Sequence, residues 1–320
     1  MALVLADKWI WDFWLTRHDE TFHLFFLQAP KSIGDPDLRH WNVSIGHAVS
    51  DDLTNWSVRA DALDPAPGPA WDDCSTWTGS IIHYDDRWHL FYTGTSRAED
   101  GRVQRIGRAT SIDLEHWVRE PDPLIVSDPR WYEQFGHEPQ RSEWHDEAWR
   151  DPWVFRGTDG RFHALITARR NLGERFDRGC VAHASSDDLD HWDVHPPITT
   201  PGGFGELEVP QVHEVDGIHY LIFCSNVATQ SESRRVTGAG TGTYYAAADG
   251  LLGPFDAASA RPLLADRIGS TYAGRLVEFD GPKLLTWLNV DEAGAFVGQL
   301  SDPVPVDRDG SATGLEVLAR

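Results

Sequence analysis

The sequence predicts an all-β fold, a five-bladed β-propeller, from two repeats and their spacing. A strand-like run recurs five times, and four copies place a bulky apolar residue and a histidine before an apolar stretch. The copies are residues 22–26 (FHLFF), 88–92 (WHLFY), 162–166 (FHALI), 218–222 (IHYLI) and a degenerate 282–287 (PKLLTW). Counted from His23 to Lys283, successive copies are 66, 74, 56 and 64 residues apart, and 320 divided by five is 64. Strands repeated at such a period are typical of small sheets arranged radially.

The second repeat has the form S-x-D-L-x-x-W and falls between the strand-like runs. Its copies are residues 50–56, 111–117 and 186–192, each after a strand of small residues, with a decayed fourth copy at 244–255. Serine and aspartate favour turns because their side chains bond nearby backbone N–H groups, while leucine and tryptophan can fill the gap between adjacent sheets. We therefore interpret these acids and tryptophans as structural, and the four strand histidines as packing or hydrogen-bonding residues.

One domain spanning residues 1–320 is expected, because the repeat runs nearly end to end without a linker. The hydrophobic content of 41% is enough for a sizeable core. No apolar run approaches the roughly 18 residues of a membrane-spanning helix, and no signal peptide is evident at the N-terminus. The three scattered cysteines Cys74, Cys180 and Cys224 fit free thiols in a reducing compartment, so a cytoplasmic location is predicted.

The charge balance restricts the classes of molecule that the chain is expected to bind. The 50 acidic residues outnumber the 28 lysines and arginines, which gives a net charge of −22. Such a field disfavours nucleic acid and anionic membranes, because both present phosphates. A neutral small carbohydrate is unaffected, and some of the 15 tryptophans offer faces on which sugar rings stack.

Three carboxylates stand outside the repeats in distinctive surroundings. Asp12 lies in an aromatic run, where an unpaired charge would be costly to bury. Asp151 follows Arg150, which can keep it ionised. Strand alternation at residues 205–212 would put Glu208 on the same face as Glu206.

The three carboxylates also share a position in the repeat. Asp12, Asp151 and Glu208 precede the histidine of the following run by 11, 12 and 11 residues. Equivalent strands of a propeller line one central channel, so the three acids should converge on its axis. Convergent carboxylates suit glycoside chemistry, in which one acts as nucleophile or base and another, with a raised pKa, protonates the leaving oxygen. The alternative is that Asp12 and Asp151 are turn acids and Glu208 a surface residue.

No metal or cofactor is predicted. The less regular histidines His137, His145 and His213 form no tight ligand cluster. The glycine-rich stretches 202–205 and 238–242 are not followed by a helix pattern, so neither reads as a phosphate loop.

Several motifs together resemble glycoside hydrolase family 32 and its clan-J relatives of family 68. Residues 9–12 (WIWD) are similar to the family's W-x-N-D, 22–30 (FHLFFLQAP) to Y-H-L-F-Y-Q-x-x-P, 46–53 (GHAVSDDL) to G-H-A-x-S-x-D-L, 77–80 (WTGS) to F-S-G-S, 150–152 (RDP) to R-D-P, and 208–210 (EVP) to E-C-P. The resemblance covers most of the chain.

This resemblance implies a five-bladed propeller and a retaining β-fructosidase. Asp12 would be the nucleophile, Glu208 the acid/base and Asp151 the transition-state stabiliser. The residues implied around the sugar are Trp9, Trp11, Gln28, Trp41, Trp77, Thr78 and Arg150. The substrates would be sucrose, fructo-oligosaccharides or fructans, with fructosyl transfer to sugar acceptors as an open alternative to hydrolysis.

The chain departs from the family pattern in ways that rework the floor of the sugar site. Trp11 replaces the asparagine before the nucleophile, residues 13–15 (FWL) replace Pro-Asn-Gly, and Val209 replaces a cysteine. We expect the propeller without the C-terminal β-sandwich that usually follows it, and a homo-oligomer could cover the flank left open. An arabinan- or xylan-type propeller glycosidase, a non-catalytic sugar-binding propeller and an interaction module remain alternatives.

Overall fold

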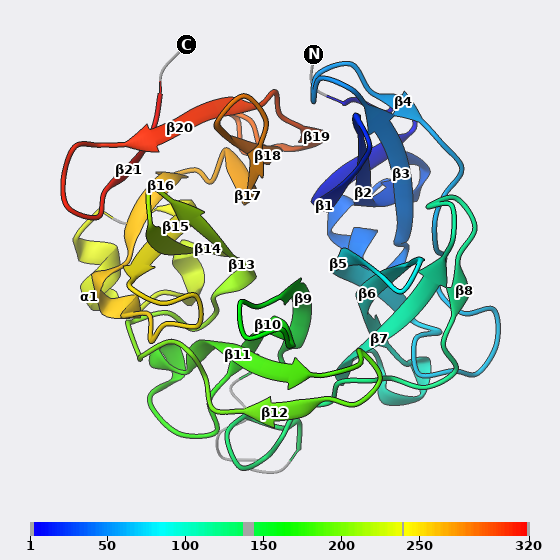
Figure 1. Cartoon of the computed structure of the whole chain (residues 1–320), viewed down its shortest axis with the longest axis horizontal. Coiled ribbons are helices and arrows are strands. Elements are labelled where there is room, and N and C mark those ends of the chain that lie inside the picture. Colours follow the sequence, from blue (N-terminus) through cyan, green and yellow to red (C-terminus); the bar gives the residue numbers. More distant parts are fainter. Residues whose placement is uncertain (1–2, 137–143, 239, 319–320) are drawn as a thin grey trace.

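The structure, a computed structural model, describes residues 3–136, 144–238 and 240–318. These residues form five small antiparallel sheets arranged in a ring (Figure 1). This confirms the five-bladed propeller. No helix in the described part of the chain is long and apolar enough to cross a membrane. The three cysteines are free.

Each of the first three blades is a four-stranded sheet in sequence order. Blade 1 contains β1 (Lys8–His18), β2 (Thr21–Pro30), β3 (Ser44–Ser50) and β4 (Ser57–Val58). Blade 2 contains β5 (Ser75–Tyr84), β6 (Arg87–Thr95), β7 (Gln104–Ser111) and β8 (Val118–Arg119). Blade 3 contains β9 (Trp149–Arg156), β10 (Phe162–Arg169), β11 (Gly179–Ser186) and β12 (Asp193–His195).

Blade 4 has the same strand order as the first three, and blade 5 has an additional strand. Blade 4 contains β13 (Glu208–Val215), β14 (Ile218–Ser225), β15 (Thr241–Ala248) and β16 (Arg261–Asp266). Blade 5 contains β17 (Thr271–Glu278), β18 (Pro282–Val290), β20 (Val304–Arg308) and β21 (Leu315–Val317), and β19 (Phe296–Leu300) also pairs with β18. The helical turns are η1 (Lys31–Ile33), η2 (Pro36–Trp41), η3 (Arg97–Glu99), η4 (Arg175–Asp177), η5 (Val227–Thr229), α1 (Glu232–Val236) and η6 (Ala257–Ser259).

Both sequence repeats occupy equivalent places in the blades. The strand-like runs lie in the second strands β2, β6, β10, β14 and β18, and each S-x-D-L-x-x-W copy follows a third strand. In the third copy, the Asp188 carboxylate accepts hydrogen bonds from the backbone N–H groups of residues 190 and 191 at 2.9 and 2.8 Å. Trp192 then packs edge-on against Phe91 of the preceding blade, with ring centroids 5.6 Å apart. The structural interpretation of this repeat is confirmed.

The strand histidines are likewise packing and hydrogen-bonding residues. His23 Nδ1 lies 3.0 Å from His47 Nε2 within blade 1, and His163 Nδ1 lies 2.9 Å from His183 Nε2 within blade 3. Each pair stacks its rings between adjacent strands. These contacts confirm that these histidines pack and form hydrogen bonds within their sheets.

The innermost strands share a bulge, and this feature shapes the centre of the propeller. In four of them, two residues oppose one on the second strand, and in β5 a single residue is inserted. The bulged pairs are 11–12, 151–152, 209–210 and 273–274, and Thr78 is the inserted residue. Asp151, Val209 and Ala273 have φ values of 58°, 53° and 48° there. Bulges break the ladder and re-aim side chains, so the direction of the side chains changes at this point of each inner strand.

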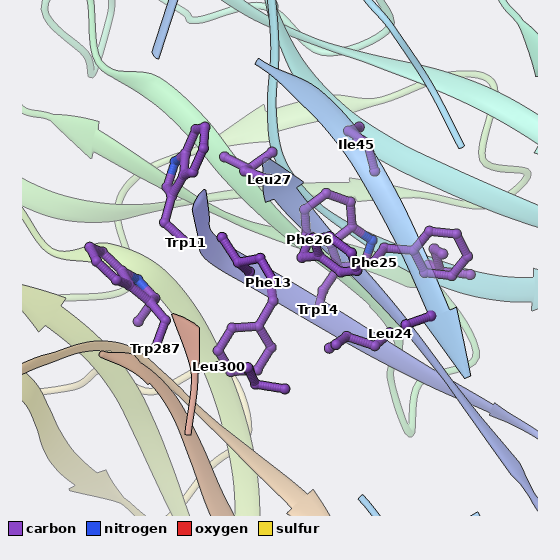
Figure 2. Packing of buried hydrophobic residues seen from close by; sticks show 14 of the residues in the cluster. Trp11, Phe13, Trp14, Leu24, Phe25, Phe26, Leu27, Ile45, Trp287 and Leu300 are labelled. Carbon is purple, nitrogen blue, oxygen red and sulfur yellow. The ribbon is translucent and has the colours of Figure 1, made fainter. Parts of the chain in front are cut away.

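The ring closes between blades 1 and 5 without a shared strand, because every described sheet is one continuous stretch of chain. Leu300 N–H donates to Leu3 O at 3.2 Å. Trp287 and Leu300 of blade 5 pack into the same apolar cluster as Phe13 and Trp14 of blade 1 (Figure 2). Side-chain packing therefore holds blade 5 against blade 1 in place of a shared strand.

Candidate active site

A cavity of about 260 Å³ lies among the innermost strands. The carboxylates Asp12 on β1, Asp151 on β9 and Glu208 on β13 all line it. Three different blades thus each contribute one carboxylate to the lining of the same cavity. Each acid lies at or next to the bulge of its strand, which accounts for their similar offsets in the sequence.

Asp12 is half-buried and held by two neutral donors. Thr78 Oγ1 donates to Asp12 Oδ2 at 2.8 Å, and Trp287 Nε1 donates to Oδ1 at 3.1 Å. Burial raises the pKa of Asp12; the hydrogen bond from Thr78 opposes this rise, and the charge of Glu208 adds to it. Two donors on two oxygens fix the orientation of the carboxylate and favour its ionised form.

Asp151 is held more rigidly, by contacts from three blades. Thr167 Oγ1 and the Val209 backbone N–H donate to Asp151 Oδ2 at 2.8 and 3.1 Å. Its own N–H donates to Thr93 Oγ1 at 3.0 Å. Burial raises the pKa of Asp151, while Arg150, whose Nε lies 3.7 Å from Oδ2, lowers it.

Glu208 faces one cation and one phenol. Arg150 Nη2 donates to Glu208 Oε1 at 2.8 Å and to Glu206 Oε1 at 2.9 Å. The Tyr272 hydroxyl donates a hydrogen bond to Glu208 Oε2. Burial, followed by the charge of Glu206, raises the pKa of Glu208, although Arg150 opposes the rise. The common contact with Arg150 also places Glu206 and Glu208 on one side of the strand.

Arg150 is the cation of the cavity wall. Burial alone would lower the pKa of Arg150, but the charges of Glu206, Glu208, Asp151 and Asp146 raise it well above its ordinary value. Arg150 therefore stays protonated and links the acids of β9 and β13.

A second arginine supports this group from behind. Arg169 is fully buried and donates to Glu206 Oε1 and Asp146 Oδ1, both at 2.9 Å. Gln104 Nε2 donates to Asp146 Oδ2 at 2.9 Å. Burial would raise the pKa of Asp146, but Arg169 and Arg150 lower it, so Asp146 is ionised.

Aromatic side chains form another part of the wall. Trp77 Nε1 donates to the backbone oxygen of His40 at 2.9 Å, and the rings of Trp41 and Trp77 lie 5.7 Å apart. Burial, and next the charge of Arg39, lower the pKa of His40 to about 3, so His40 is neutral near pH 7. The cavity thus combines ionised and protonatable carboxylates with flat apolar faces.

The structure brings most of the sequence-predicted residues to this cavity. Those that line it are Trp11, Asp12, Trp41, Trp77, Thr78, Arg150, Asp151 and Glu208. Trp9 and Gln28 do not line it. Trp9 packs edge-on against Phe296 of β19, with centroids 6.0 Å apart, and Gln28 is buried with its Nε2 donating to Ser44 Oγ at 3.1 Å. The roles of all ten residues stay predictions.

Sequence reasoning missed several residues of the site. His40, Gln104 and Asp146 line the cavity from outside the repeated positions. Tyr272 and Trp287 come from blade 5, which has no candidate acid. Tyr272 precedes Lys283 by 11 residues, the offset of Asp12 and Glu208 from their histidines, so the repeat arithmetic could have found it.

Known proteins resemble this chain in both sequence and structure. Residues 10–275 match the family described as "Glycosyl hydrolases family 32 N-terminal domain". A sucrose-6-phosphate hydrolase of Bacillus subtilis (strain 168) is 29% identical over 209 residues, which cover 63% of this chain and 38% of that protein. A fructan 6-exohydrolase of Beta vulgaris is 25% identical over 201 residues, which cover 61% of this chain and 30% of that protein. The matched part spans about a third of the length of these relatives.

Solved structures share the fold. An inulosucrase from Halalkalicoccus jeotgali bound to kestose superposes with a TM-score of 0.78 at 21% identity, covering 98% of this chain and 89% of that one. A thermostable family-43 glycoside hydrolase superposes with a TM-score of 0.71 at 16% identity, covering 100% and 96%. At such identities the similarity demonstrates the common propeller alone. The match over residues 10–275 goes further: this chain belongs to glycosyl hydrolase family 32.

Proposed function

We propose that the chain is a retaining glycosidase of β-fructofuranosides such as sucrose, fructo-oligosaccharides or fructans. The observation that carries the proposal is the meeting of Asp12, Asp151 and Glu208 on the wall of one cavity, with Arg150 contacting two of them. A retaining mechanism needs a nucleophile and a separate acid/base. The surroundings of the three acids suit three different roles.

Asp12 is the proposed nucleophile. One of its carboxylate oxygens forms a bond to the anomeric carbon of fructose while the bond from that carbon to the leaving oxygen breaks. Thr78 and Trp287 each donate to one Asp12 oxygen, so the carboxylate is oriented before substrate arrives. Orientation of this kind lowers the barrier because the reacting atoms already lie in a reactive geometry.

Glu208 is the proposed acid/base. Its raised pKa keeps a proton available, which passes to the leaving oxygen as the glycosidic bond breaks. In the second step, ionised Glu208 takes a proton from water, whose oxygen attacks the anomeric carbon and releases Asp12. A sugar hydroxyl in place of water gives fructosyl transfer.

Asp151 is proposed to stabilise the charge that develops on the sugar ring. Its backbone and one carboxylate oxygen are fixed by hydrogen bonds, and Arg150 lies beside it. A fixed carboxylate can accept hydrogen bonds from ring hydroxyls that strengthen in an oxocarbenium-like transition state.

Product analysis tests the proposal. The purified chain is incubated with sucrose, an inulin-type and a levan-type oligosaccharide, and an aryl arabinofuranoside, with methanol added as a second acceptor. We expect release of fructose from at least one fructoside and formation of methyl β-fructofuranoside, which records retention. Cleavage of the arabinofuranoside alone would instead support the arabinan/xylan type. Sugar binding without turnover would support a non-catalytic propeller.

A further inference from the structure

Arg275 is a buried cation next to the cavity that the proposed chemistry does not yet use. It lies on β17 in blade 5 and is 1% exposed. No carboxylate in the described residues lies within 4 Å of it in an ion pair. A buried charge without a contacting counter-ion is costly, so its retention here calls for a physical explanation.

The guanidinium of Arg275 binds backbone oxygens of two other blades. Its Nε donates to Phe13 O at 3.2 Å, and its Nη1 donates to Pro210 O at 3.3 Å and to Val209 O at 3.5 Å. Phe13 directly follows Asp12, and Val209 directly follows Glu208. One side chain therefore holds the backbone beside both proposed reacting carboxylates.

The oxygens of Val209 and Pro210 belong to the bulge of β13, and the oxygen of Phe13 belongs to the residue that follows the bulge of β1. A bulge leaves backbone groups outside the ladder, and a buried carbonyl without a donor destabilises the fold. Val209 also has a φ of 53°, which is strained for a β-branched residue. Arg275 supplies donors where the ladder cannot, and so stabilises these bulges.

The position of Arg275 in the ring adds to this effect. It donates from blade 5 to blade 1 across the seam that no strand bridges, and its guanidinium lies 5.2 Å from the ring of Trp153 in blade 3. Gln211 Nε2 of blade 4 donates to Gly274 O, next to Arg275, at 2.8 Å. Arg275 is therefore fixed by several blades at once.

We propose that Arg275 is a positioning residue: it fixes the distance between the bulges that carry Asp12 and Glu208, and thereby the relative placement of nucleophile and acid/base. This inference rests on the proposed function for its kinetic consequences. Its structural part, the placement of Asp12 relative to Glu208, does not depend on which sugar is cleaved.

Arg275 also acts on Asp12 through its charge. Burial lowers the pKa of Arg275 to about 10, so it is a cation at neutral pH and favours the ionised form of Asp12. The charged and titratable groups around Asp12 are Arg39, Asp151, Glu208, Cys224 and Arg275. Removing Arg275 should move the acid limb of kcat/KM to higher pH, because Asp12 then ionises less readily.

The experiment compares Arg275→Met, Arg275→Lys and a matched control, Arg108→Met. Arg108 is also a buried arginine that donates to a backbone oxygen of a neighbouring blade, Leu189 O at 3.1 Å, but it lies away from the cavity. Measurements are kcat and KM on the cleaved fructoside, the pH profile, Tm, and the titration of Asp12 and Glu208 by carboxyl-carbon NMR.

Arg275→Met is expected to lower kcat by about 10²-fold, since a misplacement of about 1 Å costs that much, with a smaller change in KM. Arg275→Lys keeps the charge but not the planar donor array, so its acid limb should stay near that of wild type while kcat falls less than in Arg275→Met. Arg108→Met should lower Tm and leave kcat within about twofold of wild type, since it touches no reacting group.

Two results would overturn the inference. One is Arg275→Met with wild-type kcat and acid limb; the other is a loss of activity that tracks Tm equally in Arg275→Met and Arg108→Met. If Arg275→Met does not fold, Arg275→Lys decides by the same kinetic criteria. If the wild-type chain cleaves no fructoside, the proposed function fails, and an unchanged Asp12 titration in the variants would separately refute the role of Arg275.

Discussion

The propeller carries aspartates in two repeated settings, and burial gives them opposite electrostatics. The turn acids Asp52, Asp113 and Asp188 lie near the surface, where hydrogen bonds from backbone N–H groups and neighbouring side chains lower their pKa values. The axial acids Asp12 and Asp151 lie at bulges in the interior of the ring, half-buried and buried respectively, and burial raises their pKa values. The same residue type thus supports the fold in one setting and lines the proposed active site in the other.

The difference lies in what the backbone offers. A turn presents several N–H groups of its own to a carboxylate, whereas the axial carboxylates at the bulges take their hydrogen bonds mostly from side chains of other strands. Position within the repeat therefore separates the structural acids from those of the proposed site better than residue type or local composition does.

The largest expected contrast is in turnover. Asp12→Ala and Glu208→Ala should each lower kcat by about 10³-fold or more, because nucleophile and acid/base are lost. Asp188→Ala should leave kcat within about twofold, because it touches no reacting group. Kinetics on the cleaved fructoside, with circular dichroism to verify folding, measure the contrast. Full activity of Asp12→Ala would end the nucleophile assignment.

A smaller effect is expected from loosening Asp12 without removing it. Thr78→Val deletes the hydrogen bond that opposes the raised pKa of Asp12, so that pKa should rise further and the acid limb of kcat/KM should move to higher pH. We expect a loss of about tenfold in kcat/KM, the equivalent of one hydrogen bond to a charged group. Thr76→Val on the same strand serves as control, since Thr76 does not line the cavity. An unshifted limb would show that Thr78 does not tune Asp12.

Stability should change in opposite directions in the two settings. The pKa of Glu208 is raised from 4.5 in the fold, so its contribution to stability is fully present below 4.5 and lost as pH rises through the folded pKa. Glu208→Gln keeps an acceptor for Arg150 and removes a partly buried charge, so Tm should rise by a few degrees at pH 7 and by less near pH 4. Asp188→Asn should lower Tm at pH 7. Calorimetry at both pH values decides, and a lower Tm for Glu208→Gln at pH 7 would contradict the burial argument.

The last effect concerns a half-buried base, His183. Burial, and next the charges of His195 and His163, lower the pKa of His183 to about 3. The unfolded chain binds this proton near pH 6.5, so stability is present above that pH and is lost as pH falls toward 3. His183→Phe should remove roughly 2 kcal/mol of the loss in unfolding free energy between pH 7 and pH 5. Urea unfolding at the two pH values measures it, and an unchanged pH dependence would exclude His183 as a contributor.

The fold could be predicted because its repeats are local and regular. The five strand-like runs mark the second strand of every blade, and the offset of 11 or 12 residues points to the bulge of each inner strand. The same offset leads to Thr78 in blade 2 and Tyr272 in blade 5.

The remaining site residues could not be predicted in this way. His40 and Asp146 reach the cavity from segments outside the sheets, whose path no periodicity encodes. Trp9 shares strand parity with Trp11 and was expected beside the sugar, but β19, an additional strand absent from the other described blades, packs against it. Only the three-dimensional arrangement reveals that contact.

The seam between blades 1 and 5 has a consequence for heat inactivation. Trp287 of blade 5 donates to Asp12 of blade 1, so a local opening of this seam disconnects the proposed nucleophile while the individual sheets persist. Catalysis should therefore fail on heating before the sheets melt, with backbone amides at the seam exchanging earliest. A sugar bound between these two blades would stabilise the seam. Loss of activity and early amide exchange should then both shift to higher temperature as the sugar concentration rises.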